Sequence, residues 1–169
     1  PELFAKLAAL GVCGLTIDEA YGGQGRDVVA AVAVIEELCR GGAFAAGPFI
    51  HCAFYGGIHI SENGSEAQKR ELLPRLARGE LLFAYGLSEP EVGGDLASVA
   101  TTARRDGDEV VLDGFKRWCT GADWADYIYC LVKSDPEAPR YRNLSLVLVP
   151  TGLPGVKVHP IEHANLRYT

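Results

Sequence analysis

The apolar residues of this chain follow two different periods, and the change near residue 81 constrains the fold more than any other feature. Before that point, apolar residues recur every three to four positions, which is the spacing of a helix that buries one face. After it, short apolar runs alternate with turn residues, which is the pattern of strands. We therefore predict an α+β chain with a helical bundle domain over residues 1–80 and a β domain over residues 81–169.

The helical half is predicted in four parts, over residues 1–10, 27–40, part of 47–60, and 65–78. Asp27 is an expected N-cap, and Ser65 with Gln68 forms an expected capping box. Pro74 is expected to kink or divide the last helix, because proline cannot donate a helical hydrogen bond. The small residues of 47–60 permit close packing. The expected buried face of the second helix consists of Val28, Val32, Ile35 and Leu38.

The second half is predicted to hold strands over residues 81–87, 101–105, 109–112, 115–120, 127–133 and 144–149, with another beginning at 155–159. Asp106-Gly107-Asp108 lies between two of these runs and predicts a hairpin. Helices followed by a meandering sheet do not give the alternating order of a dinucleotide-binding fold. The glycines at 22, 23 and 25 are therefore not a dinucleotide fingerprint.

Composition excludes several classes of function. The net charge is −6, from 16 basic and 22 acidic residues, whereas nucleic-acid binders carry the opposite balance. The longest apolar run, residues 28–35, is far shorter than the roughly 20 residues that span a bilayer. The five cysteines are scattered without a C-x-x-C pair, which indicates buried free thiols rather than disulfides or zinc. The chain contains no Met, so we expect it to be part of a longer product.

Two segments carry residues that core packing does not explain. Residues 85–95 leave a strand and enter a loop rich in Pro and Gly, which exposes backbone donors to a ligand. In residues 117–122, Trp118 stands two positions before Thr120, so both would share one face of a strand. A flat ring beside a hydroxyl suits a planar heterocycle. Trp118 taken alone is more often a core residue, because aromatic side chains dominate cores.

Together these segments resemble the acyl-CoA dehydrogenase family. Residues 85–95 read Y-G-L-S-E-P-E-V-G-G-D and are similar to the family pattern Y-x-L-T-E-P-x-x-G-S-D, while Trp118-Cys119-Thr120 stands where the family has W-I-T. Residues 14–25 and 64–80 also resemble family segments, so the likeness covers nearly the whole chain.

The resemblance implies an FAD-dependent oxidoreductase that dehydrogenates an acyl-CoA thioester at its α and β carbons. It also implies an antiparallel, barrel-like β domain, a further C-terminal helical domain, and a catalytic Glu beyond Thr169, so the written piece alone would be inactive. The implied cofactor-binding residues are Tyr85, Leu87, Ser88, Gly93, Trp118, Cys119 and Thr120. The implied substrate-binding residues are Val92 and Gly94.

The sequence departs from the family pattern at Gly94, where the family has Ser, and Ser88 replaces the common Thr. Glu89 and Asp95 are interpreted as residues that anchor the loop, since short acidic side chains often accept hydrogen bonds from turn backbone. The histidines show no metal spacing. By resemblance we expect an electron-transfer flavoprotein as acceptor, a homodimer or homotetramer, and a bacterial cytoplasmic location rather than the mitochondrial matrix.

Three alternatives remain open at the level of sequence. The chain could belong to a non-catalytic partner subunit of a heteromeric complex, which the missing Ser at position 94 suggests. It could belong to a flavin oxidase or monooxygenase of the same fold. It could also be a structural domain without a ligand, which the paired motifs argue against.

Overall fold

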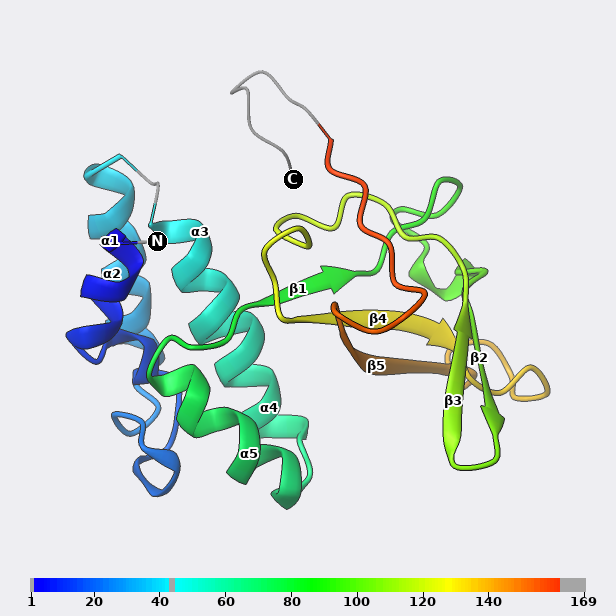
Figure 1. Ribbon diagram of the computed structural model, residues 1–169, viewed down its shortest axis with the longest axis horizontal. Helices are drawn as coiled ribbons and strands as arrows, with labels where there is room; N and C mark the ends of the chain where they lie inside the picture. Colours follow the sequence, from blue (N-terminus) through cyan, green and yellow to red (C-terminus); the bar gives the residue numbers. More distant parts are fainter. Residues whose placement is uncertain (1, 43–44, 162–169) are drawn as a thin grey trace. The chain divides into compact units, whose positions relative to one another are not determined.

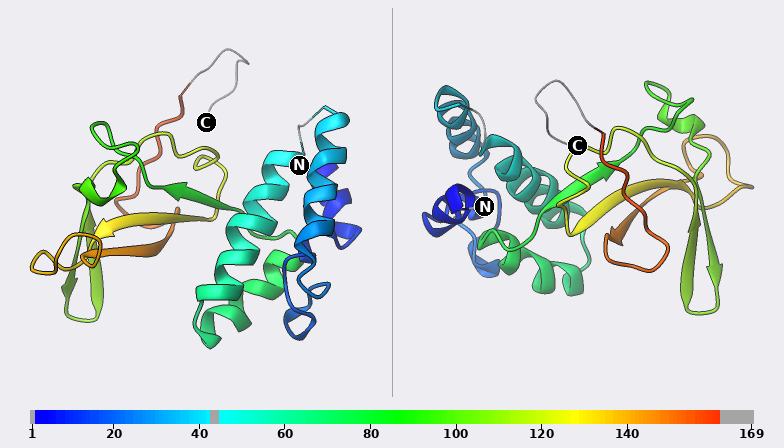
Figure 2. Two further views of the ribbon diagram at one scale, coloured as in Figure 1. Left: turned by 180° about the vertical axis from the view of Figure 1, so that it is seen from behind. Right: turned by 45° about the horizontal axis from the view of Figure 1, so that its top comes forward.

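The computed structural model describes residues 2–42 and 45–161. Its contacts divide the chain into two compact units, Pro1–Phe83 and Ala84–Thr169, each of which is described by itself. The first unit is helical and the second is built on a sheet (Figures 1 and 2). The prediction of a helical domain followed by a β-sheet domain is confirmed.

The helices lie where the sequence predicts them, with two short 3₁₀ helices between the first and second. Ser65 Oγ accepts from Gln68 N at 3.3 Å and Gln68 Oε1 accepts from Ser65 N at 2.8 Å, so the capping box forms. Asp27 accepts from Ala30 N at 2.8 Å and caps the second helix. The elements are α1 (Glu2–Ala9), η1 (Val12–Gly14), η2 (Glu19–Tyr21), α2 (Val28–Arg40), α3 (Ala46–Phe49), η3 (Ile50–Ile58), α4 (His59–Asn63) and α5 (Glu66–Ala77).

The third predicted helix contains a π-helical segment that its sequence does not predict. Helical backbone runs from α3 through α4, but its middle part, η3, has π-helical hydrogen bonding. Hydrogen bonds join this part to the rest of the unit: Thr16 Oγ1 donates to Ala53 O at 2.6 Å, and Nδ1 of His51, a residue of η3, lies 2.7 Å from Phe83 O. A Cβ on Gly57 would come within 2.4 Å of Thr16 Oγ1, so the small residue is needed for this approach.

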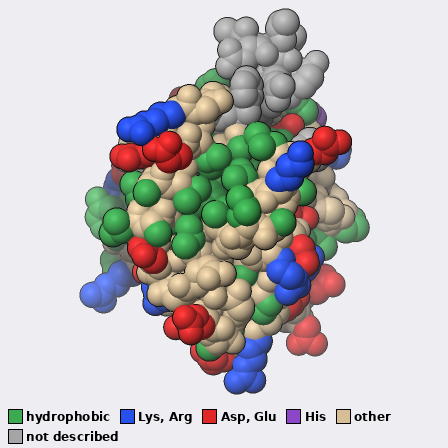
Figure 3. Space-filling view, turned by 90° about the vertical axis from the view of Figure 1, so that its left-hand side faces the viewer, with side chains coloured by type: hydrophobic (Ala, Val, Ile, Leu, Met, Phe, Trp, Pro, Cys, Tyr) green, Lys and Arg blue, Asp and Glu red, His purple; other side chains and the backbone are tan. Residues whose placement is uncertain are grey.

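Two expectations about the helices need correction. The division considered at Pro74 does not occur, since α5 continues through Pro74 and ends only at Ala77. Val28 and Val32 are each 44% exposed, and Ala31 is the buried residue of α2. A helical period identifies an apolar stripe but not what covers it. Figure 3 shows hydrophobic side chains gathered on the face of the molecule seen from the side of α1 and α2.

The second unit holds a five-stranded sheet in the order β1-β4-β2-β3, with β5 also paired to β4. The β2–β3 hairpin closes at Asp106 and Glu109 as predicted, and β4 pairs antiparallel with β5 along its whole length. β2 pairs parallel with β4 at Thr102 and Lys133, so this sheet is mixed rather than purely antiparallel. The strands are β1 (Phe83–Gly86), β2 (Thr102–Asp106), β3 (Glu109–Asp113), β4 (Tyr127–Lys133) and β5 (Leu144–Pro150), with a 3₁₀ helix η4 (Leu96–Ser98).

Two predicted strands do not form. Residues 115–120 run as irregular backbone that ends in a turn, because Trp118 has φ 61° and Gly121 has φ 77°, which a pleated strand does not adopt. Residues 155–159 are also irregular. The cysteine expectation needs a correction as well, because Cys39 is exposed and Cys119 is half-buried, whereas Cys13, Cys52 and Cys130 are buried.

Candidate functional site

The first motif leaves the sheet at the end of β1 and folds into a tight turn. Glu89 N donates to Val92 O at 2.9 Å, and Val92 N donates to Glu89 O at 3.1 Å. The Val92 side chain is buried by this turn, whereas Gly93 and Gly94 are exposed. A Cβ built on either glycine meets nothing within 4 Å. The loop therefore presents open backbone, rather than side chains, to its surroundings.

Glu89 is the buried acceptor around which this loop is organised. Its side chain accepts from Ala100 N at 2.6 Å, from Thr101 N at 2.9 Å and from Thr101 Oγ1 at 2.5 Å. Burial alone would raise the pKa of Glu89, but the hydrogen bonds from Lys116, Thr101 and the two backbone amides outweigh it and lower the pKa to about 2. The interpretation of Glu89 as a loop-anchoring residue is confirmed.

Asp95 has the same kind of role at the other end of the loop. Its carboxylate accepts from Ser98 Oγ at 2.6 Å and forms an ion pair with Arg140 from the β4–β5 connection. These contacts, first of all the hydrogen bond from Arg140, lower the pKa of Asp95. Its interpretation as an anchor is also confirmed.

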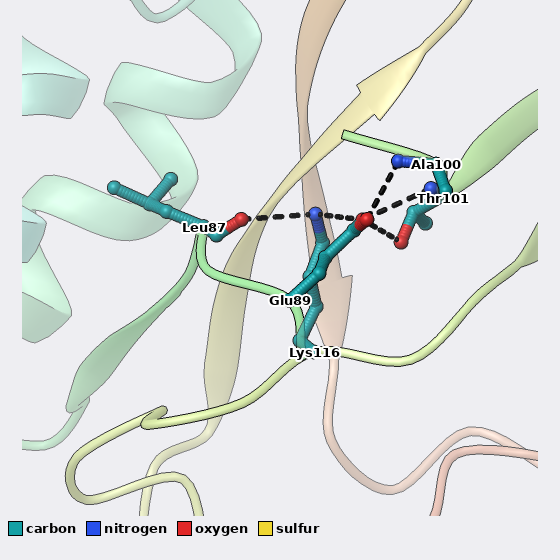
Figure 4. Close-up of polar contacts among 5 residues, drawn as sticks. All are labelled: Leu87, Glu89, Ala100, Thr101 and Lys116. Atoms are coloured by element: carbon teal, nitrogen blue, oxygen red, sulfur yellow. Dashed lines mark hydrogen bonds and ion pairs between the residues drawn. The ribbon is translucent and has the colours of Figure 1, made fainter. Parts of the chain in front are cut away.

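The second motif lies against the first, as Figure 4 shows for the residues that join them. Lys116 Nζ donates to Glu89 Oε1 at 2.8 Å and to Leu87 O at 3.2 Å. Arg117 N donates to Ser88 O at 2.8 Å. Segments that lie about 30 residues apart in the sequence are thus hydrogen-bonded side by side, directly before Trp118.

Trp118 is not a core residue. Its side chain is 63% exposed, its backbone lies in the left-handed region, and the Arg117 guanidinium carbon stands 4.4 Å from its ring centroid. Left-handed backbone is unusual for a bulky residue and often marks a functional site. An exposed indole held in a fixed position offers a flat surface to a planar ring.

The other predicted residues of the second motif divide between packing and exposure. Cys119 is half-buried and packs against a cluster of Ala84, Ala122 and Ala125, and burial raises the pKa of its thiol. Thr120 is exposed at the start of a turn, and its backbone N donates to Trp118 O at 3.0 Å. The prediction that Trp118 and Thr120 share one face of a strand is therefore wrong, because no strand forms here. Both residues are nevertheless exposed.

A cavity of about 470 Å³ lies in the sheet unit beside the second motif. Much of its lining is apolar and includes Phe115, Trp118, Cys119, Ile128, Val149 and Val156. Two residues of this region, Lys116 and Thr101, were not predicted from the sequence as part of the site. The available signal was Lys116 close to Phe115 and Trp118, because a charge that becomes buried among apolar residues requires a partner.

Within residues 2–42 and 45–161, no helix is long and apolar enough to cross a membrane. In the same residues no group of three or more His, Cys, Asp or Glu side chains is placed to hold a metal ion.

Two family profiles together match most of the chain. Residues 1–80 match the acyl-CoA dehydrogenase N-terminal domain, and residues 84–166 match the acyl-CoA dehydrogenase middle domain. The chain belongs to the acyl-CoA dehydrogenase family. FAD is the cofactor that membership of this family implies.

Individual acyl-CoA dehydrogenases give the same result. The chain is 37% identical to acyl-CoA dehydrogenase FadE26 of Mycobacterium tuberculosis over 95% of its own length and 40% of that protein. It matches the steroid ACAD Tcur3481-Tcur3483 with a TM-score of 0.86 at 37% identity, over 99% of this chain and 43% of that one. It matches an acyl-CoA dehydrogenase complexed with FAD from Bacillus anthracis with a TM-score of 0.85 at 35% identity, over 96% and 27%. The chain thus spans less than half the length of these acyl-CoA dehydrogenases.

Proposed function

We propose that this chain forms the helical and sheet domains of an FAD-dependent acyl-CoA dehydrogenase, which removes hydrogen from the α and β carbons of an acyl-CoA thioester. The observation that carries the proposal is the direct contact between the two motifs. Arg117 N bonds to Ser88 O, and Lys116 bonds to Leu87 O, so the residues proposed to hold the flavin come from one continuous surface.

The residues at this surface fit FAD. In the proposed arrangement Trp118 lies against the isoalloxazine ring, Thr120 donates a hydrogen bond near flavin N5, and Tyr85, Leu87, Ser88, Gly93 and Cys119 complete the cofactor-binding surface. When bound, FAD supplies the acceptor for the hydride that leaves the β carbon. Exposed Trp118 and Thr120 are open to a ligand, whereas Cys119 would contribute mainly through packing and backbone.

For the substrate we propose an acyl-CoA whose thioester lies along Gly94 and the turn at Val92. Gly94 leaves the loop without the side-chain hydroxyl that the family's usual Ser would offer to the acyl-CoA. The name of the steroid ACAD relative supports a steroid side chain as one candidate. We assign no carboxylate of this chain as the catalytic base, because Glu89 and Asp95 serve as structural anchors, and we propose that the base lies outside residues 1–169.

The proposal extends to the setting of the enzyme. We propose an electron-transfer flavoprotein as electron acceptor, a homodimer or homotetramer as assembly, a role in lipid metabolism, and a bacterial cytoplasmic location. A second candidate function is a partner subunit that supplies part of a shared site, and the absent Ser at position 94 favours it.

The test is the visible spectrum of the full-length protein, before and after anaerobic addition of a panel of acyl-CoA thioesters. A bound flavin that bleaches with one member of the panel would support the dehydrogenase and identify its substrate class. A protein that binds no flavin, or whose flavin stays oxidised with every thioester, would contradict the dehydrogenase and favour the partner subunit. Rapid reoxidation of reduced flavin by oxygen would favour an oxidase.

A further inference from the structure

The ion pair between Lys116 and Glu89 is buried, which sets it apart from the other ion pairs of the described residues. Their side chains are 10% and 5% exposed, whereas every other ion pair of the described residues has at least one side chain that is more than 40% exposed. Removing two charges from water costs free energy that their attraction only partly returns. A buried ion pair is therefore weak evidence of a stabilising role and suggests another reason for its presence.

The hydrogen bonds of the pair indicate what that reason is. Lys116 Nζ divides its bonds between the Glu89 carboxylate and the backbone carbonyl of Leu87. The Glu89 carboxylate is in turn fixed by Ala100 and Thr101, which lie outside both motifs (Figure 4). Lys116 is therefore held at a point defined by residues 100–101, and it holds the chain on both sides of Ser88.

The same contacts fix the start of the second motif. Arg117, the residue after Lys116, donates its backbone N–H to Ser88 O, and Trp118 follows in a left-handed conformation. Ser88 and Trp118 are thus connected through the hydrogen bonds that Lys116 and Arg117 make to residues 87–89. Loss of Lys116 would free both the Leu87 carbonyl and the segment that leads into Trp118.

We propose that Lys116 and Glu89 are positioning residues, which set Ser88 and Trp118 at the separation that the flavin requires, in addition to what Glu89 contributes to stability. This inference rests on the proposed function, because it takes the flavin to be the ligand between those residues. Neither residue is assigned a contact with the reacting atoms.

The experiment is a double-mutant cycle in the full-length protein, with Lys116→Met, Glu89→Gln and the double variant. Each single variant leaves a buried group without its charged partner, so each should lower the unfolding midpoint. The double variant removes both charges and should recover part of that loss, because the glutamine amide at position 89 can accept with only one of its two polar atoms. Its FAD dissociation constant should nevertheless stay raised by at least about 10-fold, and its rate of flavin reduction should fall by on the order of 100-fold, as for a misplacement of about 1 Å.

The flavin absorbance spectrum and reduction potential supply readouts that a purely structural role would not move. Both should differ from wild type in the double variant and not in Arg104→Met/Asp106→Asn, a matched control that removes an exposed ion pair of the same unit. If the double variant recovers stability, FAD affinity, spectrum and potential together, the pair is structural and the inference is overturned. If the wild-type protein binds no FAD, the proposed function fails and the inference fails with it.

Discussion

Thr120 is the residue from which a direct effect on flavin chemistry is most readily measured. Its hydroxyl is exposed next to Trp118, and we expect it to donate a hydrogen bond near flavin N5. Thr120→Val keeps the shape but removes the donor, so flavin reduction should slow by up to about 10-fold while FAD affinity changes less, because the bond matters most as hydride arrives. Stopped-flow reduction and FAD titration measure the two quantities, and unchanged reduction kinetics would contradict this role.

Gly94 tests how the loop meets the substrate. A side chain at this position meets no neighbouring atom within 4 Å, and the backbone is not in the left-handed region, so serine fits without strain. Gly94→Ser should strengthen acyl-CoA binding by about 0.5–1.5 kcal/mol if it adds one neutral hydrogen bond. Calorimetric titration with the thioester that bleaches the flavin measures this. Gly152→Ser, at an equally unhindered position outside the proposed site, is the control, and weaker binding by the Gly94 variant would indicate a loop shaped for a bulkier ligand.

Glu89 makes the stability of the sheet unit depend on pH. Its pKa is lowered from an ordinary 4.5 to about 2, so its contribution is fully present above about pH 4.5 and is lost as the pH falls through 2. At 1.36 kcal/mol per pKa unit this is on the order of 3 kcal/mol. The free energy of unfolding of wild type and of Glu89→Gln should be measured from pH 7 to pH 2. The difference between the two proteins should become smaller below about pH 4.5. A difference in free energy of unfolding that does not change with pH would contradict the lowered pKa of Glu89.

At the scale of elements, the α5 cap is the feature that local sequence predicts most directly. Ser65 and Gln68 satisfy each other's backbone N–H groups, which the first helical turn would otherwise leave without partners. Ser65→Ala should lower the free energy of unfolding by about 1 kcal/mol, whereas Ser65→Asn, which retains a capping oxygen, should cost much less. Denaturant titration compares them, and equal losses would show that the cap contributes little.

Other elements show where local prediction reaches its limit. Residues 115–120 follow an expected turn and contain Phe115 and Trp118, which favoured a strand. The backbone amide of Arg117 instead bonds to Ser88 O and not to a strand ladder. The helix over 46–63 was predictable from its small and apolar residues, but its π-helical part was not. Its geometry depends on Thr16 and Phe83, which lie far away in the sequence.

At the scale of the whole chain, each unit contains its own hydrophobic core. Leu73 is fully buried in the helical unit, and Val132 is fully buried in the sheet unit. Leu73→Ala should therefore destabilise the helical unit by about 2–5 kcal/mol, the usual cost of such a cavity. Leu10→Ala, at a position that is 76% exposed, is the matched control and should change stability by less than about 0.5 kcal/mol. Amide hydrogen exchange of α5 reports the difference, and equal protection in both variants would contradict the assigned core.

The sequence was sufficient to predict a helical domain followed by a β-sheet domain, the caps at Asp27 and Ser65, the family, and the anchoring roles of Glu89 and Asp95. The caps depend on hydrogen bonds made within three positions. The anchors were recognisable because short acidic side chains often accept hydrogen bonds in turns, although their partners include residues 11 to 45 positions away. The exposure of Trp118 and the link that Lys116 makes between the two motifs became visible only in the three-dimensional structure. The physical reason is that burial and pairing depend on contacts between distant segments, such as the one across 27 residues that pairs Lys116 with Glu89.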